Sequence, residues 1–323
     1  MSTPVVLFTC AGQRVDIVQA FARAGATTLA VDLNELSPAL YAADRRAAVP
    51  PVDDPGYVAA LARLVEEHGA DLIVPLADLD HRILAARRDE LGALVLLPAP
   101  ETIALCEDKH EAARFFERHG LPSPRTWLPE EVPESVAFPL LVKARRGFGS
   151  RHIYRASDPE ELRFFLDYTT AESMVQQVCV GEEFSIDVFC DLQTRCLGAI
   201  PRTMIESKGG ESIKGMTIRD EELIEHGRRV AEVMRIVGPA NIQCFREPDG
   251  SLPVTDVNPR FGGGFPLPTA AGSGYPELAL ALARGERPEP RLGDFREGVV
   301  MTRYFSEVLL ERNGASLLPV REG

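Results

Sequence analysis

Continuous apolar runs alternate with amphipathic segments along the first hundred residues. Apolar residues recur every three or four positions over 15–24 and 57–68, which predicts two helices, and Gly69 is placed to end the second. Uninterrupted apolar runs predict buried strands at 5–9, 28–31, 72–76 and 94–97. Buried strands separated by helices are typical of a parallel sheet with right-handed crossovers. We therefore expect a Rossmann-like domain over residues 1–105.

The pattern changes after Pro98 to short strands and helices. Asp108 lies three residues before Glu111, close to a capping box, and a helix is predicted over 111–119. Further along, strands are predicted at 140–144, 152–155 and 173–178, with a helix at 159–168. These elements indicate a small α+β subdomain over residues 106–180.

The remaining residues, 181–323, mix alternating strands with one long helix. The strands are expected at 184–189, 241–245, 254–257 and 299–305, and the helix at 220–237. No internal repeat is visible. The sequence therefore predicts an α/β protein with an N-terminal parallel sheet followed by two α+β subdomains.

Composition and charge narrow the range of partners. The chain is 45% hydrophobic and 26% charged, which excludes disorder and allows a large core. Its net charge of -13 argues against nucleic-acid or anionic-membrane partners. Only four of the 35 basic side chains are lysine: Lys109, Lys143, Lys208 and Lys214. An anionic ligand would need a local cluster of basic groups.

The cysteines and the N-terminal residues indicate the cellular compartment. The six cysteines form no CxxC pair and lie at no close spacing to histidine, which is typical of reduced thiols in a cytosol. The N-terminal residues lack the basic and apolar regions of a signal peptide, and no run approaches the roughly 20 apolar residues of a membrane span. We expect a cytoplasmic protein.

The turn after the first predicted strand, TCAGQR, invites a nicotinamide-cofactor interpretation. Asp32 ends the second strand 20 residues after Gly12. The dinucleotide fingerprint needs three glycines, however, and only Gly12 is present. We therefore favour a sheet that holds no dinucleotide. Arg14 and Asp78 are then candidates for a substrate-facing wall, or they are ordinary surface charges.

The segment LVKARRGFGSRHIYR predicts a strand, a basic loop and a return strand. Lys143 leaves the first strand, and Gly147, Gly149 and Ser150 lie in the loop. Backbone amides of such a loop can face phosphate oxygens while the lysine supplies a point charge. No GKS or GKT follows, so the loop is not a P-loop. A hairpin with a solvated basic turn explains this segment equally well.

A second hairpin, MVQQVCVGEEFSIDVF, could bind a nucleoside. A bare strand edge can offer amide and carbonyl groups to adenine, and an acid just past the turn can accept both ribose hydroxyls. The alternative is a hairpin with surface glutamates.

The segment NIQCFREPDGSLPVTDVNPRFGGG is the most informative. The two-residue period of a strand places Asp256, Asn258 and Arg260 on one face, and Gln243 can lie beside Asp256 on an antiparallel partner. Oxygen side chains with one formal negative charge suit Mg²⁺ that takes further ligands from water and phosphate. Arg260 and the amides of 262–264 could then meet an oxyanion or a carboxylate. A polar strand face with a flexible turn explains neither the spacing nor the glycines.

In their order, these segments resemble the ATP-grasp superfamily, closest to the carbamoyl-phosphate-synthase-like branch of carboxylate–amine ligases. The resemblance covers about residues 5–285 and rests on EDKHEAARFFERHGLPSP, LVKARRGFGS, VQQVCVGEEFSIDVF, and the QCF and DVNPRFGGG pair. It implies an ATP-grasp architecture, in which a Rossmann-like pre-ATP-grasp domain precedes two subdomains that clasp ATP.

The resemblance also implies roles for single residues. Those expected to bind the nucleotide are Lys109 and Lys143 on the α and β phosphates, Gly147, Gly149 and Ser150 over them, Gln176, Gln177 and Val178 at adenine, and Glu183 at ribose. The expected metal ligands are Gln243, Asp256 and Asn258. The expected catalytic residues are Arg260, near the γ-phosphate, and Arg202 with Lys214 or Lys208 in a mobile stretch.

The implied activity is ATP-dependent joining of a small carboxylate, expected to be an amino acid, to an amine. It would use two Mg²⁺ ions, with Mn²⁺ as a substitute. The chain departs from the family where Asp256 replaces Glu, where Arg151 and His152 replace a further loop glycine, and where glutamine replaces an acid at 176 and 177. No glutaminase segment is present, so a full carbamoyl-phosphate synthase is not expected. The alternatives are a non-catalytic ATP-binding sensor and, more remotely, an NAD-dependent enzyme; a homodimer through the first domain is common in the family.

Overall fold

The structure is a computed structural model that describes residues 3–147, 152–208, 211–313 and 316–320. Its first sheet is parallel, with the strand order β3-β2-β1-β4-β5. The strands are β1 Val5–Thr9, β2 Thr27–Asp32, β3 Arg45–Ala48, β4 Leu72–Pro75 and β5 Leu94–Val95. The helices are α1 Val15–Arg23, α2 Ala39–Ala42, α3 Tyr57–His68, α4 His81–Ala86 and α5 Pro100–Glu107. The order reverses between β1 and β4, and ligands of open α/β sheets usually bind beyond the strand ends at such a point.

The predicted helices and strands of this part are confirmed, whereas strand β3 and helices α2, α4 and α5 were not predicted. Gly69 ends α3 in the left-handed conformation at φ 64°, as its position after the apolar pattern predicted. The missed strand, β3, pairs with β2 at the sheet edge. Its sequence, RRAA, is largely exposed and carries no apolar pattern that could be recognised.

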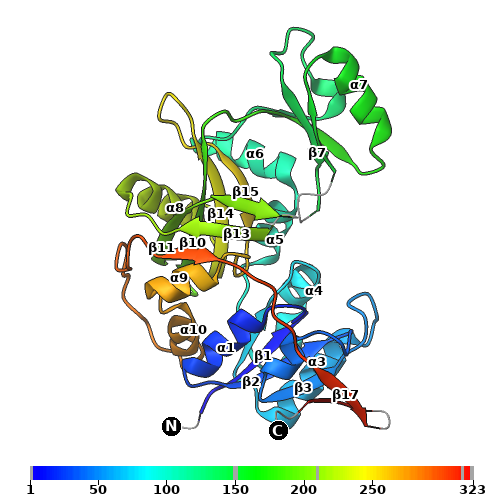
Figure 1. Cartoon of the computed structure of the whole chain (residues 1–323), viewed down its shortest axis with the longest axis vertical. Helices are drawn as coiled ribbons and strands as arrows, with labels where there is room; N and C mark the ends of the chain where they lie inside the picture. Colours follow the sequence, from blue (N-terminus) through cyan, green and yellow to red (C-terminus); the bar gives the residue numbers. More distant parts are fainter. Residues whose placement is uncertain (1–2, 148–151, 209–210, 314–315, 321–323) are drawn as a thin grey trace.

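The second sheet is antiparallel, with the order β6-β9-β7-β8. Its strands are β6 Thr126–Trp127, β7 Leu140–Ala144, β8 Ile153–Ala156 and β9 Ser173–Gln177. Helix α6, Lys109–Arg118, precedes it, and helix α7, Pro159–Tyr168, covers one face (Figure 1). Asp108 accepts a hydrogen bond from the Glu111 amide at 3.1 Å, which confirms the predicted N-terminal cap of α6.

The third sheet is also antiparallel, with the order β11-β10-β14-β15. Its strands are β10 Glu182–Cys190, β11 Cys196–Thr203, β14 Gly238–Arg246 and β15 Val254–Asn258. The helices of this part are α8 Glu221–Val233, α9 Pro266–Ala271 and α10 Tyr275–Ala283. A smaller sheet joins β12 Glu206–Lys208, β13 Glu211–Met216 and β16 Val300–Thr302, and β17 Leu310–Asn313 pairs with β18 Ser316–Pro319.

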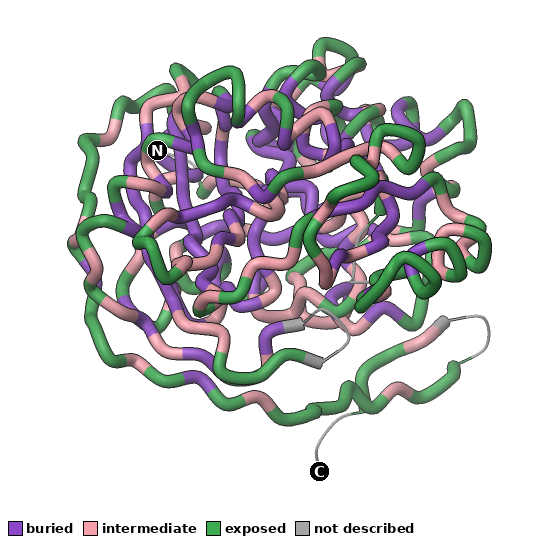
Figure 2. Tube along the Cα trace, turned by 90° about the horizontal axis from the view of Figure 1, so that it is seen from above, coloured by how far each residue is buried: buried purple, intermediate pink, exposed green. Residues whose placement is uncertain are grey.

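The three large sheets follow one another along the long axis of the molecule, and the third lies between the first and the second (Figure 1). One hydrophobic core joins the first and third sheets, since Phe8 and Phe21 belong to the same buried cluster as Phe261 and Phe265. The second sheet has a small core of its own around Leu140 and Val175. Buried residues fill the interior seen from above in Figure 2. After β16 the chain returns to the first sheet, where Arg46 donates a hydrogen bond to the Leu317 carbonyl at 3.1 Å.

Two predictions about the chain as a whole can be compared with the structure. All six cysteines are free, in agreement with the absence of a disulfide framework. Among the described residues, no helix has the length and apolar character needed to cross a membrane.

Candidate functional site

Three charged residues that the sequence singled out converge where α6, β7 and β15 meet. Lys109 begins α6, Lys143 lies in β7 and Asp256 lies in β15. The Lys109 ammonium lies 3.5 Å from the Asp256 carboxylate and donates a hydrogen bond to the Gly147 carbonyl at 2.9 Å. Residues separated by about 150 positions in the chain therefore share one site.

Asp108 holds the two lysine-bearing elements together. Besides capping α6, its carboxylate forms ion pairs with Arg145 at 2.8 Å and with Arg146 at 3.0 Å, both just beyond β7. The Lys109 amide donates to the Arg145 carbonyl at 3.1 Å. Burial disfavours ionisation of Asp108, but hydrogen bonds from Arg145 and the Glu111 amide outweigh it, so its pKa lies below the ordinary value.

The Lys143 side chain is buried, with 8% of the residue exposed. Among the described residues, its ammonium has no hydrogen-bond or ion-pair partner. Burial lowers its pKa to about 8; the positive charge of Lys109 acts in the same direction, whereas Asp256 and Glu183 oppose the shift. A positive charge on a largely buried side chain without a protein partner is stabilised when an anion binds it.

The expected metal ligands lie side by side on β14 and β15. Gln243 is directly opposite Asp256 in the antiparallel register, as predicted. The Asn258 amide donates to Asp256 at 3.2 Å. No group of three His, Cys, Asp or Glu residues suited to a metal occurs among the described residues, so a cation here would depend on amide oxygens and on its other ligands.

Arg260 lies beyond the end of β15, and its guanidinium has three acceptors. It donates to Asp78 at 3.3 Å, to the Asn258 side-chain oxygen at 3.3 Å and to the Phe261 carbonyl at 3.1 Å. The sequence predicted its proximity to Asn258. The contact with Asp78, which links the first sheet to this loop, was not predicted because the two residues are 182 positions apart.

The glycines after Arg260 have a packing role that the sequence did not reveal. A Cβ on Gly264 would lie 2.5 Å from the Arg202 guanidinium carbon, and one on Gly262 would lie 2.7 Å from an Asp187 oxygen. Asp187 and Arg202 form a buried ion pair at 2.8 Å, to which Asn241 adds a hydrogen bond at 2.9 Å. Glycine is therefore needed there for close approach, whether or not its amides bind a ligand.

This packing corrects the expectation for Arg202. It lies in the regular strand β11 rather than in a mobile stretch, and it is 2% exposed. Lys214, in β13, is about half exposed and forms an ion pair with Glu206 at 2.6 Å. Lys208 ends β12, where the structure describes only its backbone.

The expected adenine edge also needs correction. Gln176 and Gln177 lie in β9, which pairs with both β6 and β7, so they do not form a bare strand edge. The Gln176 amide donates to the Thr126 hydroxyl at 3.0 Å. Val178 lies just past the strand and is not paired in either register. The sequence did not reveal that β9 pairs with β6, because β6 has only two residues.

Four further residues were predicted to bind the nucleotide: Glu183, Gly147, Gly149 and Ser150. Glu183, at the start of β10, has a pKa raised by burial, which the positive charges of Arg202 and Lys143 partly offset. Gly147 is exposed at the end of the described part of the basic loop. Gly149 and Ser150 lie outside the described residues.

Asp32 takes part in a local contact. Its carboxylate accepts a hydrogen bond from the Gly12 amide at 2.8 Å and thereby holds the turn after β1. The hydrogen bond explains why Gly12 and Asp32 lie together without requiring a bound dinucleotide.

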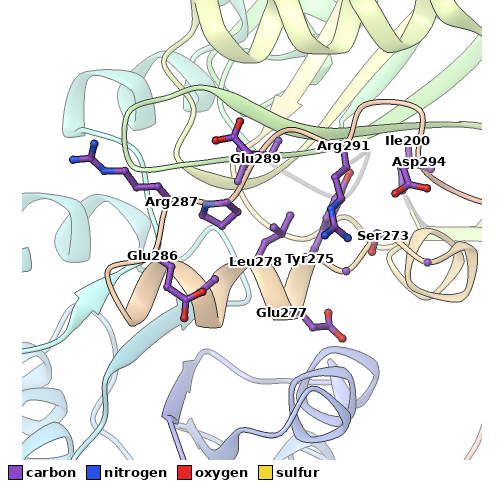
Figure 3. Close-up of a pocket in the computed structure, with 16 residues that line it drawn as sticks. Ile200, Ser273, Tyr275, Glu277, Leu278, Glu286, Arg287, Glu289, Arg291 and Asp294 are labelled. Atoms are coloured by element: carbon purple, nitrogen blue, oxygen red, sulfur yellow. The ribbon is translucent and has the colours of Figure 1, made fainter. Parts of the chain in front are cut away.

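A cavity of about 300 Å³ opens beside Lys109 and Asn258. The sequence analysis missed His81, Glu107 and Arg146, which line it together with Asp78 and Gly147. No motif marks His81 or Glu107, and the motif that contains Arg146 gave this residue no role, because the cavity forms only where all three parts of the chain meet. A larger cavity, of about 540 Å³, lies between β11, α10 and residues 286–294, and contains none of the predicted site residues (Figure 3).

Two family models match parts of the chain. Residues 6–96 match the family model "PylC-like, N-terminal domain". Residues 169–304 match the model "ATP-grasp in the biosynthetic pathway with Ter operon".

Curated relatives are carbamoyl phosphate synthases. The chain is 28% identical over 258 residues to the N-terminal section of the Methanopyrus kandleri large chain, a match of 70% of this chain and 46% of that protein. It is 23% identical over 227 residues to the Archaeoglobus fulgidus large chain, covering 63% of this chain and 21% of that one. The chain therefore spans less than half the length of these relatives.

Solved structures share the fold. The biotin carboxylase domain of Hydrogenobacter thermophilus 2-oxoglutarate carboxylase, solved with MgADP, has a TM-score of 0.75 at 16% identity, covering 99% of this chain and 84% of that one. An L-amino acid ligase from Bacillus licheniformis has a TM-score of 0.70 at 19% identity, covering 92% and 78%. The two family models, the carbamoyl phosphate synthase relatives and the α/β architecture together support placing the chain in the ATP-grasp superfamily, in its carbamoyl-phosphate-synthase-like branch.

Proposed function

We propose that this chain is an ATP- and Mg²⁺-dependent ligase that activates a carboxylate as an acyl phosphate and joins it to an amine. The observation that carries the proposal is the largely buried side chain of Lys143, whose ammonium has no hydrogen-bond or ion-pair partner among the described residues and lies in the field of Lys109 and Asp256. A nucleotide phosphate would supply the missing anion. The carbamoyl phosphate synthase relatives and the MgADP-bound structure of similar fold support this choice of ligand.

The nucleotide would lie between the second and third sheets. Lys109 and Lys143 would hold its phosphates, with Gly147 beside them. Gly149 and Ser150, which the family resemblance implies over the phosphates, lie outside the described residues. Glu183 would accept the ribose hydroxyls. The segment from Val178 onward, rather than Gln176 and Gln177, is left to offer backbone groups to adenine.

The residues around Asp256 fit a magnesium ion. The Lys109 ammonium lies 3.5 Å from this carboxylate and the Asn258 amide donates a hydrogen bond to it, so the carboxylate attracts positive groups. Gln243, Asp256 and Asn258 would hold Mg²⁺, or Mn²⁺ in its place, through hard oxygen ligands. When bound, the metal neutralises negative charge on the phosphate oxygens.

In the proposed reaction, a carboxylate oxygen attacks the γ-phosphorus of ATP and ADP leaves. The amine nitrogen then attacks the carbonyl carbon of the acyl phosphate, inorganic phosphate leaves, and the nitrogen loses a proton. Arg260 would stabilise negative charge on the transferred group, and no protein nucleophile is needed. Arg202 would act from its buried position, and Lys214 would need to leave Glu206 to reach a phosphate.

The 300 Å³ cavity is the proposed place for the carboxylate substrate. It combines positive groups, Lys109 and Arg146, with negative groups, Asp78 and Glu107. A lining of both signs suits a small zwitterion, which supports an amino acid as the activated substrate.

The experiment is an assay of ADP release with ATP, Mg²⁺ and a panel of amino and hydroxy acids, supplied singly and in pairs. We expect turnover that requires a carboxylate. Asp256→Asn should lower it about 100-fold or more, because the only carboxylate among the three metal ligands is lost. The matched control is Asp249→Asn, in the exposed turn between β14 and β15, which should retain turnover. ATP binding without turnover on any substrate would contradict the proposal and indicate a sensor.

A further inference from the structure

The loop that carries Arg260 is held by a side chain from the turn between β1 and α1. The Arg14 guanidinium donates to the Phe261 carbonyl at 3.0 Å and to the Gly262 carbonyl at 2.9 Å. Its orientation is fixed by Asp16, whose carboxylate lies 3.3 Å away. Arg14 therefore grips two consecutive carbonyls directly after Arg260, across 247 positions of sequence.

Arg14 is an unfavourable residue at the N-terminus of its own helix. It occupies the N-cap position of α1, and its side chain makes no capping hydrogen bond. A residue with a side-chain oxygen is preferred there, and a positive charge opposes the helix dipole. The local preferences of α1 do not account for this residue, whereas the contact with residues 261 and 262 does.

Two further contacts tie the same loop to the first sheet. Asp78, just beyond β4, accepts a hydrogen bond from Arg260 itself at 3.3 Å. Phe261 is 2% exposed and packs edge-on against Phe21 of α1, with ring centroids 6.0 Å apart. Polar contacts to Arg260 and to the two residues after it, and one apolar contact, thus fix the loop against the turns that follow β1 and β4, where the strand order reverses, and against α1.

We propose that Arg14 and Asp78 are positioning residues for the reaction. Asp78 would orient the Arg260 guanidinium, and Arg14 would fix the backbone that follows it. The first sheet would then be a working part of the catalytic site as well as a wall of the substrate cavity. This inference rests on the proposed function at one point, the catalytic role that the proposed function assigns to Arg260.

The test compares Arg14→Ala and Arg14→Lys with Arg23→Ala, an exposed arginine at the other end of α1. Arg14→Ala should lower kcat about 10- to 100-fold, since a misplaced catalytic group costs about that much. Its KM for ATP should stay within about twofold, because the phosphate lysines are untouched. Arg14→Lys should recover part of the loss by reaching one carbonyl, and Arg23→Ala should match the wild type.

Amide hydrogen exchange provides a readout that needs no turnover. Arg14→Ala should accelerate exchange in residues 259–265 about tenfold or more, while β14 and β15 stay protected as in the wild type. Wild-type kcat in Arg14→Ala, or unchanged exchange in 259–265, would overturn the inference. An equal loss of activity in Arg14→Ala and Arg23→Ala would also overturn it. A wild-type protein without turnover would count against the proposed ligase alone, because the exchange measurement would still decide whether Arg14 holds the loop.

Discussion

The pKa of Lys143 is lowered by its burial in the site. Burial places its pKa at about 8, against an ordinary value of 10.5. The unfolded chain keeps this proton to higher pH than the folded chain does. Without nucleotide, the Lys143 contribution to folding stability therefore increases as pH rises from about 8 to 10.5.

The first prediction concerns nucleotide binding and pH. Above pH 8 the free protein increasingly holds Lys143 as the neutral amine, which offers no charge to phosphate, so ADP affinity should fall. Near pH 8, binding should be accompanied by proton uptake. Calorimetric titration with MgADP in buffers of different ionisation enthalpy measures that uptake. Proton uptake of equal size in Lys143→Met would show that another group titrates.

The second prediction concerns the identity of the lysines. Lys109 contacts Gly147 and Asp256 through one compact ammonium, and Lys143 is buried. A planar guanidinium is bulkier at either position. Lys109→Arg and Lys143→Arg should each raise the KM for ATP about tenfold or more in steady-state kinetics. Arg118→Lys, at the far end of α6, serves as the exposed control. Unchanged kinetics in both lysine variants would make the rarity of lysine in this chain irrelevant to function.

At the scale of helices and strands, the start of α6 is the element that aligns the phosphate lysines. Asp108 caps the helix and pairs with the two arginines that follow β7. The same carboxylate therefore sets the helix N-terminus against the end of the strand that carries Lys143.

The third prediction separates these two roles of Asp108. Asp108→Ala should lower the free energy of unfolding by about 1–3 kcal/mol at pH 7, through the lost cap and the unpaired arginines, and should also weaken ADP binding. The control is Asp158→Ala, which removes the cap of α7, where Glu160 and Glu161 amides donate, without touching the lysines. It should cost about 1 kcal/mol and leave ADP affinity unchanged. Equal ADP affinity in both variants would remove Asp108 from the phosphate site.

The stability part of this prediction depends on pH. Because the pKa of Asp108 is lowered in the folded chain, its contribution is present above the ordinary carboxyl range and is lost as pH falls through the lowered value. Urea unfolding at a series of pH values should show the difference between wild type and Asp108→Ala shrinking at acid pH.

The hydrophobic pattern was sufficient where a strand is apolar throughout or a helix buries one face. It located β1, β4, α3, α6 and α7, and the short hairpin from β14 to β15 fixed the register that places Gln243 opposite Asp256. It failed for β3, which is polar, and for the neighbours of β9, because a single strand does not reveal which strands pair with it. The sequence also did not reveal that Arg202 is buried. Gly262 and Gly264 indicate that another group packs closely against them, but the sequence does not show which residue that is.

For the whole molecule, the contacts that complete the site come from distant parts of the chain. Arg14, Asp78 and His81 of the first part meet residues 258–262 of the third, and no local pattern predicts such contacts. The first and third sheets share one hydrophobic core, which supports these contacts, while the second sheet has a core of its own. The division at residues 105 and 180 and a homodimer through the first domain stay predictions.

The central claim is that the chain phosphorylates a carboxylate, and oxygen transfer tests it most directly. Panel acids labelled with ¹⁸O in the carboxylate are incubated with the protein, ATP, Mg²⁺ and an amine, and the inorganic phosphate is analysed by mass spectrometry. The proposed acyl phosphate passes one carboxylate oxygen to each phosphate released, so singly labelled phosphate should accumulate in step with ADP. Formation of ADP with phosphate that carries no ¹⁸O would contradict the account.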